Sequence, residues 1–140
     1  APVAGPAAPR SHRGAAARSL DEILVAIAQA EAIRDEPRLA SLYLEAARGH
    51  AEAGRIEMAA DLLRQSIRIA TRLGLKSVHA AARLEIGDIS RAGGDLTTAC
   101  EHWQIARGLF FELGSATELE ETEGRMRGSG CPTDWVLNDF

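Results

Sequence analysis

The most constraining feature of this sequence is a segment that recurs forty positions further along the chain. Residues 41–74 return in outline as residues 81–114. A fixed period of this length is the signature of stacked supersecondary units, each of which buries its apolar face against its neighbour. The chain is therefore expected to fold as a stack of repeats. The matching positions are Leu44 and Leu84, Glu45 and Glu85, Gly54 and Gly94, Ala59 and Ala99, Leu73 and Leu113, and Gly74 and Gly114.

The repeated units are predicted to be antiparallel pairs of α-helices. Alanine, leucine, glutamate and arginine favour helix, and long β-branched runs are absent. Ser19 is a good N-cap, and the first helix is expected to stop at Asp35-Glu36-Pro37, because the residue before a proline is pushed out of the α region. The fold class is all-α, with later helices predicted over about 38–53, 56–73, 77–92, 96–113 and 116–127.

Three segments follow from these patterns. Residues 1–18 are expected to form a disordered Ala/Pro linker, residues 19–128 the helical domain, and residues 129–140 an apolar tail. The chain starts without Met or the apolar core of a signal peptide, and no apolar run reaches the roughly 18 residues of a membrane span. We interpret it as part of a larger cytoplasmic protein without membrane contact.

Charge and cysteine content narrow the possible functions. A net charge of −4 gives no overall electrostatic case for nucleic acid. Arg10, Arg13 and Arg18 form a short basic arm, which is expected to be solvated, with contact to nucleic acid or acidic lipid as the alternative. Cys100 and Cys131 do not suggest a disulfide framework in a helical protein, and Cys100 is expected to be a small buried thiol.

Certain small residues and glycines recur in register with the repeat. Ala47 matches Gly87 in the middle of the first helix of each pair, and Leu63 matches Trp103 in the second. The turns carry Gly54 and Gly94, the second helices carry Ala59 and Ala99 near their starts, and each repeat ends in Leu-Gly. Over residues 20–127 this pattern resembles the tetratricopeptide repeat. It is most similar to the roughly 40-residue variant found in bacterial signalling and regulator proteins. Arg83, in register with Tyr43, stands where that family often has an aromatic residue.

The resemblance implies a short right-handed superhelix whose concave groove receives a peptide or a partner helix. Chaperone-tail binding is not expected, because the positions of the required Lys and Asn hold other residues. A partner with apolar anchors and some acidic residues suits the leucines and arginines that line the groove. The alternative is that Arg48 pairs with Glu45 or Glu52, and Arg91 with Asp88, on the surface. The matching groove residues are Ser41, Leu44, Arg48, Ala51, Glu52, Leu84, Asp88, Arg91 and Ala92.

The last ten residues are unusually apolar for a chain with 4% aromatic content. A free tail of this kind would be an aggregation liability, so it is expected to dock on a surface. Three interpretations remain open: the tail caps the end of the stack, it lies in the groove of its own or a second copy as autoinhibition or dimerisation, or it is a linear motif for another protein. The docking residues are Trp135, Val136, Leu137 and Phe140.

No pattern of residues predicts catalysis or a cofactor. Cys100, His102 and Cys131 lack the paired short spacings of a zinc site, and no metal is expected. Gly93-Gly94 is interpreted as a helix-ending turn instead of a phosphate loop. The chain is therefore expected to be a non-enzymatic protein-binding scaffold within a larger bacterial regulatory or assembly protein. The alternatives are a self-association module, in which the tail allows a homodimer, and an accessory domain of a nucleic-acid-linked regulator.

Overall fold

The described part of the chain is entirely helical. A computed structural model describes residues 18–132, and within that range the chain forms six α-helices and no β-strand. The all-α prediction is therefore confirmed, and the predicted helices agree with the observed ones to within a few residues at each end. The helices are α2 (Leu20–Ala32), α3 (Glu36–Glu52), α4 (Ile56–Leu73), α5 (Lys76–Ala92), α6 (Leu96–Leu113) and α7 (Ala116–Gly128).

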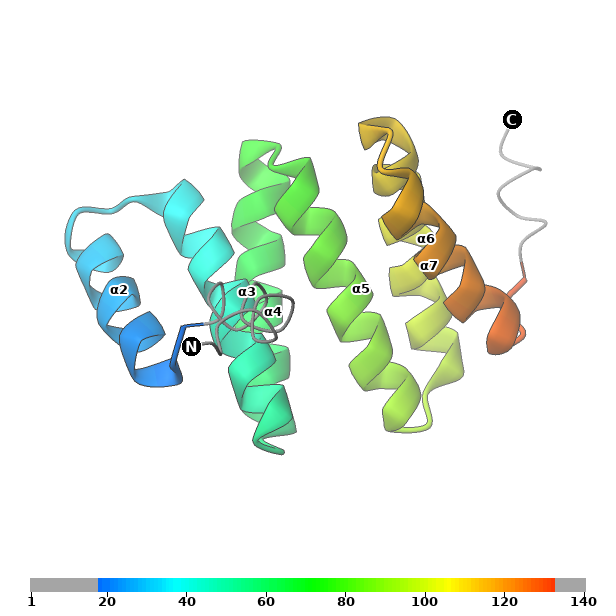
Figure 1. Cartoon of the computed structure of the whole chain (residues 1–140), viewed down its shortest axis with the longest axis horizontal. Coiled ribbons are helices and arrows are strands. Elements are labelled where there is room, and N and C mark those ends of the chain that lie inside the picture. Colours follow the sequence, from blue (N-terminus) through cyan, green and yellow to red (C-terminus); the bar gives the residue numbers. More distant parts are fainter. Residues whose placement is uncertain (1–17, 133–140) are drawn as a thin grey trace, which may run out of the picture.

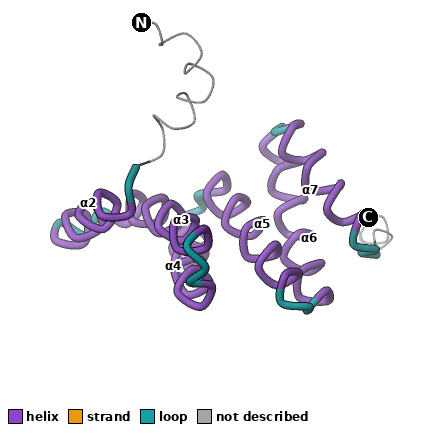
Figure 2. Tube along the Cα trace, turned by 60° about the horizontal axis from the view of Figure 1, so that its bottom comes forward, coloured by secondary structure: helices purple, strands orange, loops and turns teal. Residues whose placement is uncertain are grey.

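The helices are arranged in a row that follows the order of the chain. Figure 1 shows α2 at one end and α7 at the other, with each helix antiparallel to the one before it. Each helix packs on its successor, and α3 also contacts α5. Figure 2 shows the same succession from another direction. No described helix is both long and apolar enough to cross a membrane.

Short polar side chains begin several of the helices. Ser19 and Glu22 form a reciprocal capping box, with Glu22 N donating to Ser19 Oγ at 3.1 Å and Ser19 N to Glu22 Oε1 at 2.9 Å. Asp95 caps α6 by accepting from the backbone N of Thr98 at 3.1 Å. Pro37 was expected to stop the preceding helix, but it does not have that role. It lies in the first turn of α3, where its missing N–H has no intrahelical partner to lose.

Backbone conformations with positive φ recur at every twentieth position between residues 34 and 114, and Gly130 after α7 is a further case. They fall on Gly54 (84°), Gly74 (71°), Gly94 (87°) and Gly114 (69°), with Arg34 (56°) as the same turn before α3. Glycine adopts this region without the steric cost that a Cβ brings. The predicted turns at the glycines are confirmed, and Arg34 marks a further turn that uses a less suitable residue.

The small residues of the repeat set the spacing of the helices. Ala59 and Ala99 are fully buried at equivalent positions, next to Leu63 and Trp103. A Cβ added to Gly87 would lie 2.5 Å from Nε1 of Trp103, so any larger residue would force the indole or the helix to shift. The expectation that a small residue lets the paired helices approach closely is confirmed at this position.

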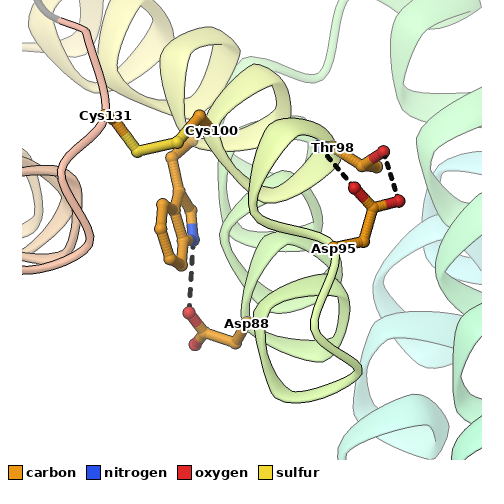
Figure 3. The surroundings of a disulfide bond; sticks show 6 residues. Asp88, Asp95, Thr98, Cys100 and Cys131 are labelled. Carbon is orange, nitrogen blue, oxygen red and sulfur yellow. Dashed lines mark hydrogen bonds between the residues drawn. A yellow bond between two sulfur atoms is a disulfide. The ribbon is translucent and has the colours of Figure 1, made fainter.

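The two cysteines form a disulfide, which corrects the expectation of a buried free thiol at Cys100. Cys100 and Cys131 are bonded, with their Cα atoms 5.6 Å apart, and both are buried (Figure 3). Cys100 lies near the start of α6, and Cys131 follows the end of α7. Because α6 and α7 are antiparallel, these two positions come together at the same end of the helix pair. The bond fastens the end of the described chain to α6.

Candidate functional site

The helices α3, α5 and α7 are joined to one another by side-chain ion pairs, and we call the surface that carries these pairs the α3–α5–α7 face. Arg48 on α3 donates to Glu85 on α5 at 2.7 Å. Arg125 on α7 donates to Asp88 on α5 at 2.8 Å. The residues that the tetratricopeptide resemblance assigns to a groove lie on α3 and α5, so this face is the candidate site.

The predicted arginines are at the surface, but the partner of Arg48 differs from the expected ones. Arg48 pairs across to Glu85 on the next repeat and not along its own helix to Glu45 or Glu52. Glu45 instead accepts two hydrogen bonds at 2.8 Å from Nη2 of Arg18. Glu52 and Arg91 are exposed near the ends of α3 and α5.

Asp88 has a structural role that the sequence did not reveal. Its Oδ1 accepts from Nε1 of Trp103 at 3.2 Å, and both of its oxygens accept from Arg125 (Figure 3 shows the indole contact). The hydrogen bond to Asp88 raises the pKa of Arg125 above its ordinary value. Asp88 therefore binds Arg125 rather than the expected Arg91, and it ties α5 to both α6 and α7.

The predicted apolar anchors belong largely to the interior. Leu44 is 6% exposed and packs with Ala47 and Leu63. Leu84 is half-buried between the cluster around Trp103 and the one around Phe110. Ser41 and Ala51 are half-buried, and Ala92 is exposed at the end of α5. The α3–α5–α7 face is thus mainly polar, and the polar predicted residues exposed on it are Arg48, Glu52 and Arg91.

The ion pairs on this face can be exchanged at low cost. Each pair is partly exposed, and exposed pairs typically contribute about 0–1 kcal/mol because solvent screens them and ordering two long side chains costs entropy. Breaking the pair between Arg48 and Glu85 is therefore expected to cost little stability. The chemistry available on the face is recognition by charge and hydrogen bonding.

A second cluster of polar side chains lies on the opposite side of α5. Nε of Arg83 donates to Nε2 of His79 at 3.0 Å, and its Nη1 lies 3.1 Å from Nδ1 of His102 on α6. Burial lowers the pKa of His79, of His102 and of Arg83 itself. In the sequence, Arg83 was notable only as a departure from an aromatic position. At the matching position, Tyr43 donates to Glu31 at 3.0 Å, so the two repeats differ here.

Several predicted residues cannot be placed. Trp135, Val136, Leu137 and Phe140 lie outside the described residues, as do Arg10 and Arg13. Cys100 and Cys131 bond to each other, and within the described residues no group of three or more His, Cys, Asp or Glu side chains is arranged to hold a metal.

No protein-family model matches this chain, and neither a curated protein nor a solved structure shows significant similarity to it.

Proposed function

We propose that this chain is a non-enzymatic protein-binding scaffold of the tetratricopeptide type, whose α3–α5–α7 face receives an extended or helical segment of a partner. One observation supports it above others: residues forty positions apart have the same structural role. Gly54 and Gly94 have nearly the same positive φ, and Gly74 and Gly114 both end helices in the left-handed conformation. Stacked helix pairs of this kind create extended surfaces that are used for binding.

Two exposed arginines on the face suit a partner segment that carries acidic residues. Arg48 and Arg91 are exposed in successive repeats, on α3 and α5. Arginine binds carboxylates through two parallel hydrogen bonds, which gives orientation as well as attraction. Because Leu44 is buried, the partner is expected to be held by polar contacts more than by apolar anchors.

Charge reversal tests this proposal. Affinity capture with the double variant Arg48→Glu and Arg91→Glu is expected to recover far less partner than the parent chain. The matched control is Arg38→Glu with Arg72→Glu, which makes the same change in net charge at exposed arginines on α3 and α4. Arg72 is paired with Glu36 at 2.9 Å, as Arg48 is with Glu85, so the control also removes one surface ion pair. Equal recovery by both double variants would reject the α3–α5–α7 face as the binding site.

Self-association is a second candidate, and exposed apolar side chains on α2 favour it. Ile23, Ala26 and Ile27 on one side of α2 are buried, yet Val25 is 57% exposed and Ile33, just after the helix, is 72% exposed. A helix that is apolar on both sides is usually covered. If two copies meet here, Val25→Glu is expected to weaken the dimer in sedimentation equilibrium, whereas Met58→Glu on α4 is not. A monomer at all accessible concentrations would contradict this candidate.

The disulfide bears on the proposed location. Disulfides persist mainly in oxidising compartments and are rare in the cytosol, so the Cys100–Cys131 bond counts against the expected cytoplasmic location.

The alternative of a nucleic-acid-linked regulator depends on the basic arm. Arg18, the arginine of that arm within the described residues, is bound by Glu45.

A further inference from the structure

A hollow of about 410 Å³ opens between α4, α5 and α6, on the side of α5 away from the α3–α5–α7 face. This volume is within the range of small-molecule sites, roughly 300–1,000 Å³. Ile67 on α4 and Ile86 on α5 supply apolar walls. The polar residues that line it include Arg64, Arg68, Arg83 and His102.

The charge in this hollow is of one sign. Among the described residues that line it, none is acidic. Arg64 is paired with Asp61 at 2.7 Å, just outside the hollow. Neither Arg68 nor Arg83 forms a salt bridge with another described residue. On the other side of α5, by contrast, Glu85 and Asp88 each accept from an arginine. The hollow therefore has an excess of positive charge.

Arg83 is the central group of the hollow. It is half-buried and held between two histidine rings, which accept its hydrogen bonds but carry no negative charge when neutral. The pKa of His102 is lowered by burial first and then by the positive charges of Arg83 and Arg64. Burial lowers the pKa of Arg83, and an anion bound beside its guanidinium would offset part of this desolvation cost. The two histidines fix its orientation in advance, which reduces the entropy that a ligand must lose on binding.

We propose that the hollow between α4, α5 and α6 is a binding site for a small organic phosphate, with the phosphoryl group at Arg83 and Arg68 and the apolar part against Ile67 and Ile86. Guanidinium groups match the geometry of phosphate oxygens and bind them through paired hydrogen bonds. The mixture of apolar walls and a few convergent polar groups is typical of a small-ligand site. This site is separate from the partner-binding face and does not depend on it.

The test is an NMR titration of the whole chain with phenyl phosphate at low ionic strength, with benzoate and inorganic phosphate as comparison ligands. Backbone signals of α4, α5 and α6 around the hollow are expected to shift, and added salt is expected to weaken binding. Arg83→Gln is expected to weaken binding by about tenfold or more, as for loss of a hydrogen bond to a charged group. Arg68→Gln, which changes an exposed residue and should leave the fold intact, is expected to act in the same direction.

The control variant is Arg38→Gln, at an exposed arginine on α3 outside the hollow, and it is expected to bind phenyl phosphate like the parent chain. Weaker binding of inorganic phosphate than of phenyl phosphate would support the apolar part of the site, and weaker binding of benzoate would support the phosphoryl preference. No shift at millimolar phenyl phosphate, or an equal loss with Arg38→Gln, would overturn the proposal. So would tighter binding of benzoate than of phenyl phosphate.

Discussion

A methyl group at position 87 tests how closely α5 and α6 must approach. Gly87 lies in the middle of α5, and a Cβ there would lie 2.5 Å from Nε1 and 2.6 Å from Cδ1 of Trp103. Trp103 is fully buried, and its indole donates to Asp88, so it has little room to move. Gly87→Ala therefore forces either the indole or the α5–α6 spacing to change.

Two opposing effects decide the magnitude. Alanine is favoured over glycine in a helix interior by roughly 1 kcal/mol. Overpacking of a buried site typically costs about 1–3 kcal/mol, and loss of the hydrogen bond between Trp103 and Asp88 adds roughly 1 kcal/mol. The expected result is a net destabilisation of about 1–3 kcal/mol. For a chain of this size that corresponds to a fall in Tm of very roughly 3–10 °C.

The chain supplies its own control for this substitution. Gly108 on α6 is also helical, but an added Cβ would meet nothing within 4 Å. Gly108→Ala is therefore expected to stabilise the fold by up to about 1 kcal/mol, the opposite sign. Urea denaturation followed by circular dichroism measures both variants. If Gly87→Ala were as stable as Gly108→Ala, the close contact with Trp103 would not limit the packing of α5 on α6.

Three other changes are expected to alter the stability of the fold in a direction that follows from the structure. Cys131→Ser is expected to lower the free energy of unfolding by roughly 3–4 kcal/mol, the chain-entropy value for a disulfide that spans 31 residues. In urea denaturation, the parent chain under reductant should be as unstable as this variant. Arg34→Gly is expected to raise the Tm slightly, because Arg34 has φ 56°, whereas Gly94→Ala should lower it. Stability measured across pH should be maximal above about 6.5 and fall as pH decreases below it. The pKa values of His50, His79 and His102 are below 6.5 in the fold, so the unfolded chain takes up protons first.

The local features of the fold were predictable because the sequence encodes them over a few residues. Gly54 and Gly94 mark turns since glycine adopts positive φ readily, and Ser19 with Glu22 forms a capping box over one helical turn. The prediction that Pro37 stops a helix was wrong because proline is common both just after helices and in their first turn. Only the capping by Asp35 shows that Pro37 begins α3.

Contacts between helices were harder to predict, because they depend on which faces meet. The partner of Arg48 lies on the next repeat, and no spacing along α3 indicates it. The disulfide did leave a signal. Cys100 and Cys131 lie at nearly equal distances along the chain on either side of the turn at Gly114, so an antiparallel helix pair brings them together. The near-symmetric spacing of the two cysteines about this turn therefore indicates the disulfide.

The two proposals can be separated because α5 carries them on opposite sides. Towards α3 and α7 it carries Glu85 and Asp88, each paired with an arginine of a neighbouring helix. Towards α4 and α6 it presents Arg83 without an acidic partner among the described residues. Arg83→Gln should therefore weaken phenyl phosphate binding by about tenfold or more and leave partner capture unchanged. The double variant Arg48→Glu and Arg91→Glu should have the reverse effect, apart from a small general increase in anion repulsion that added salt removes. If each variant impaired both activities equally, the two sides of α5 would have to be treated as one site.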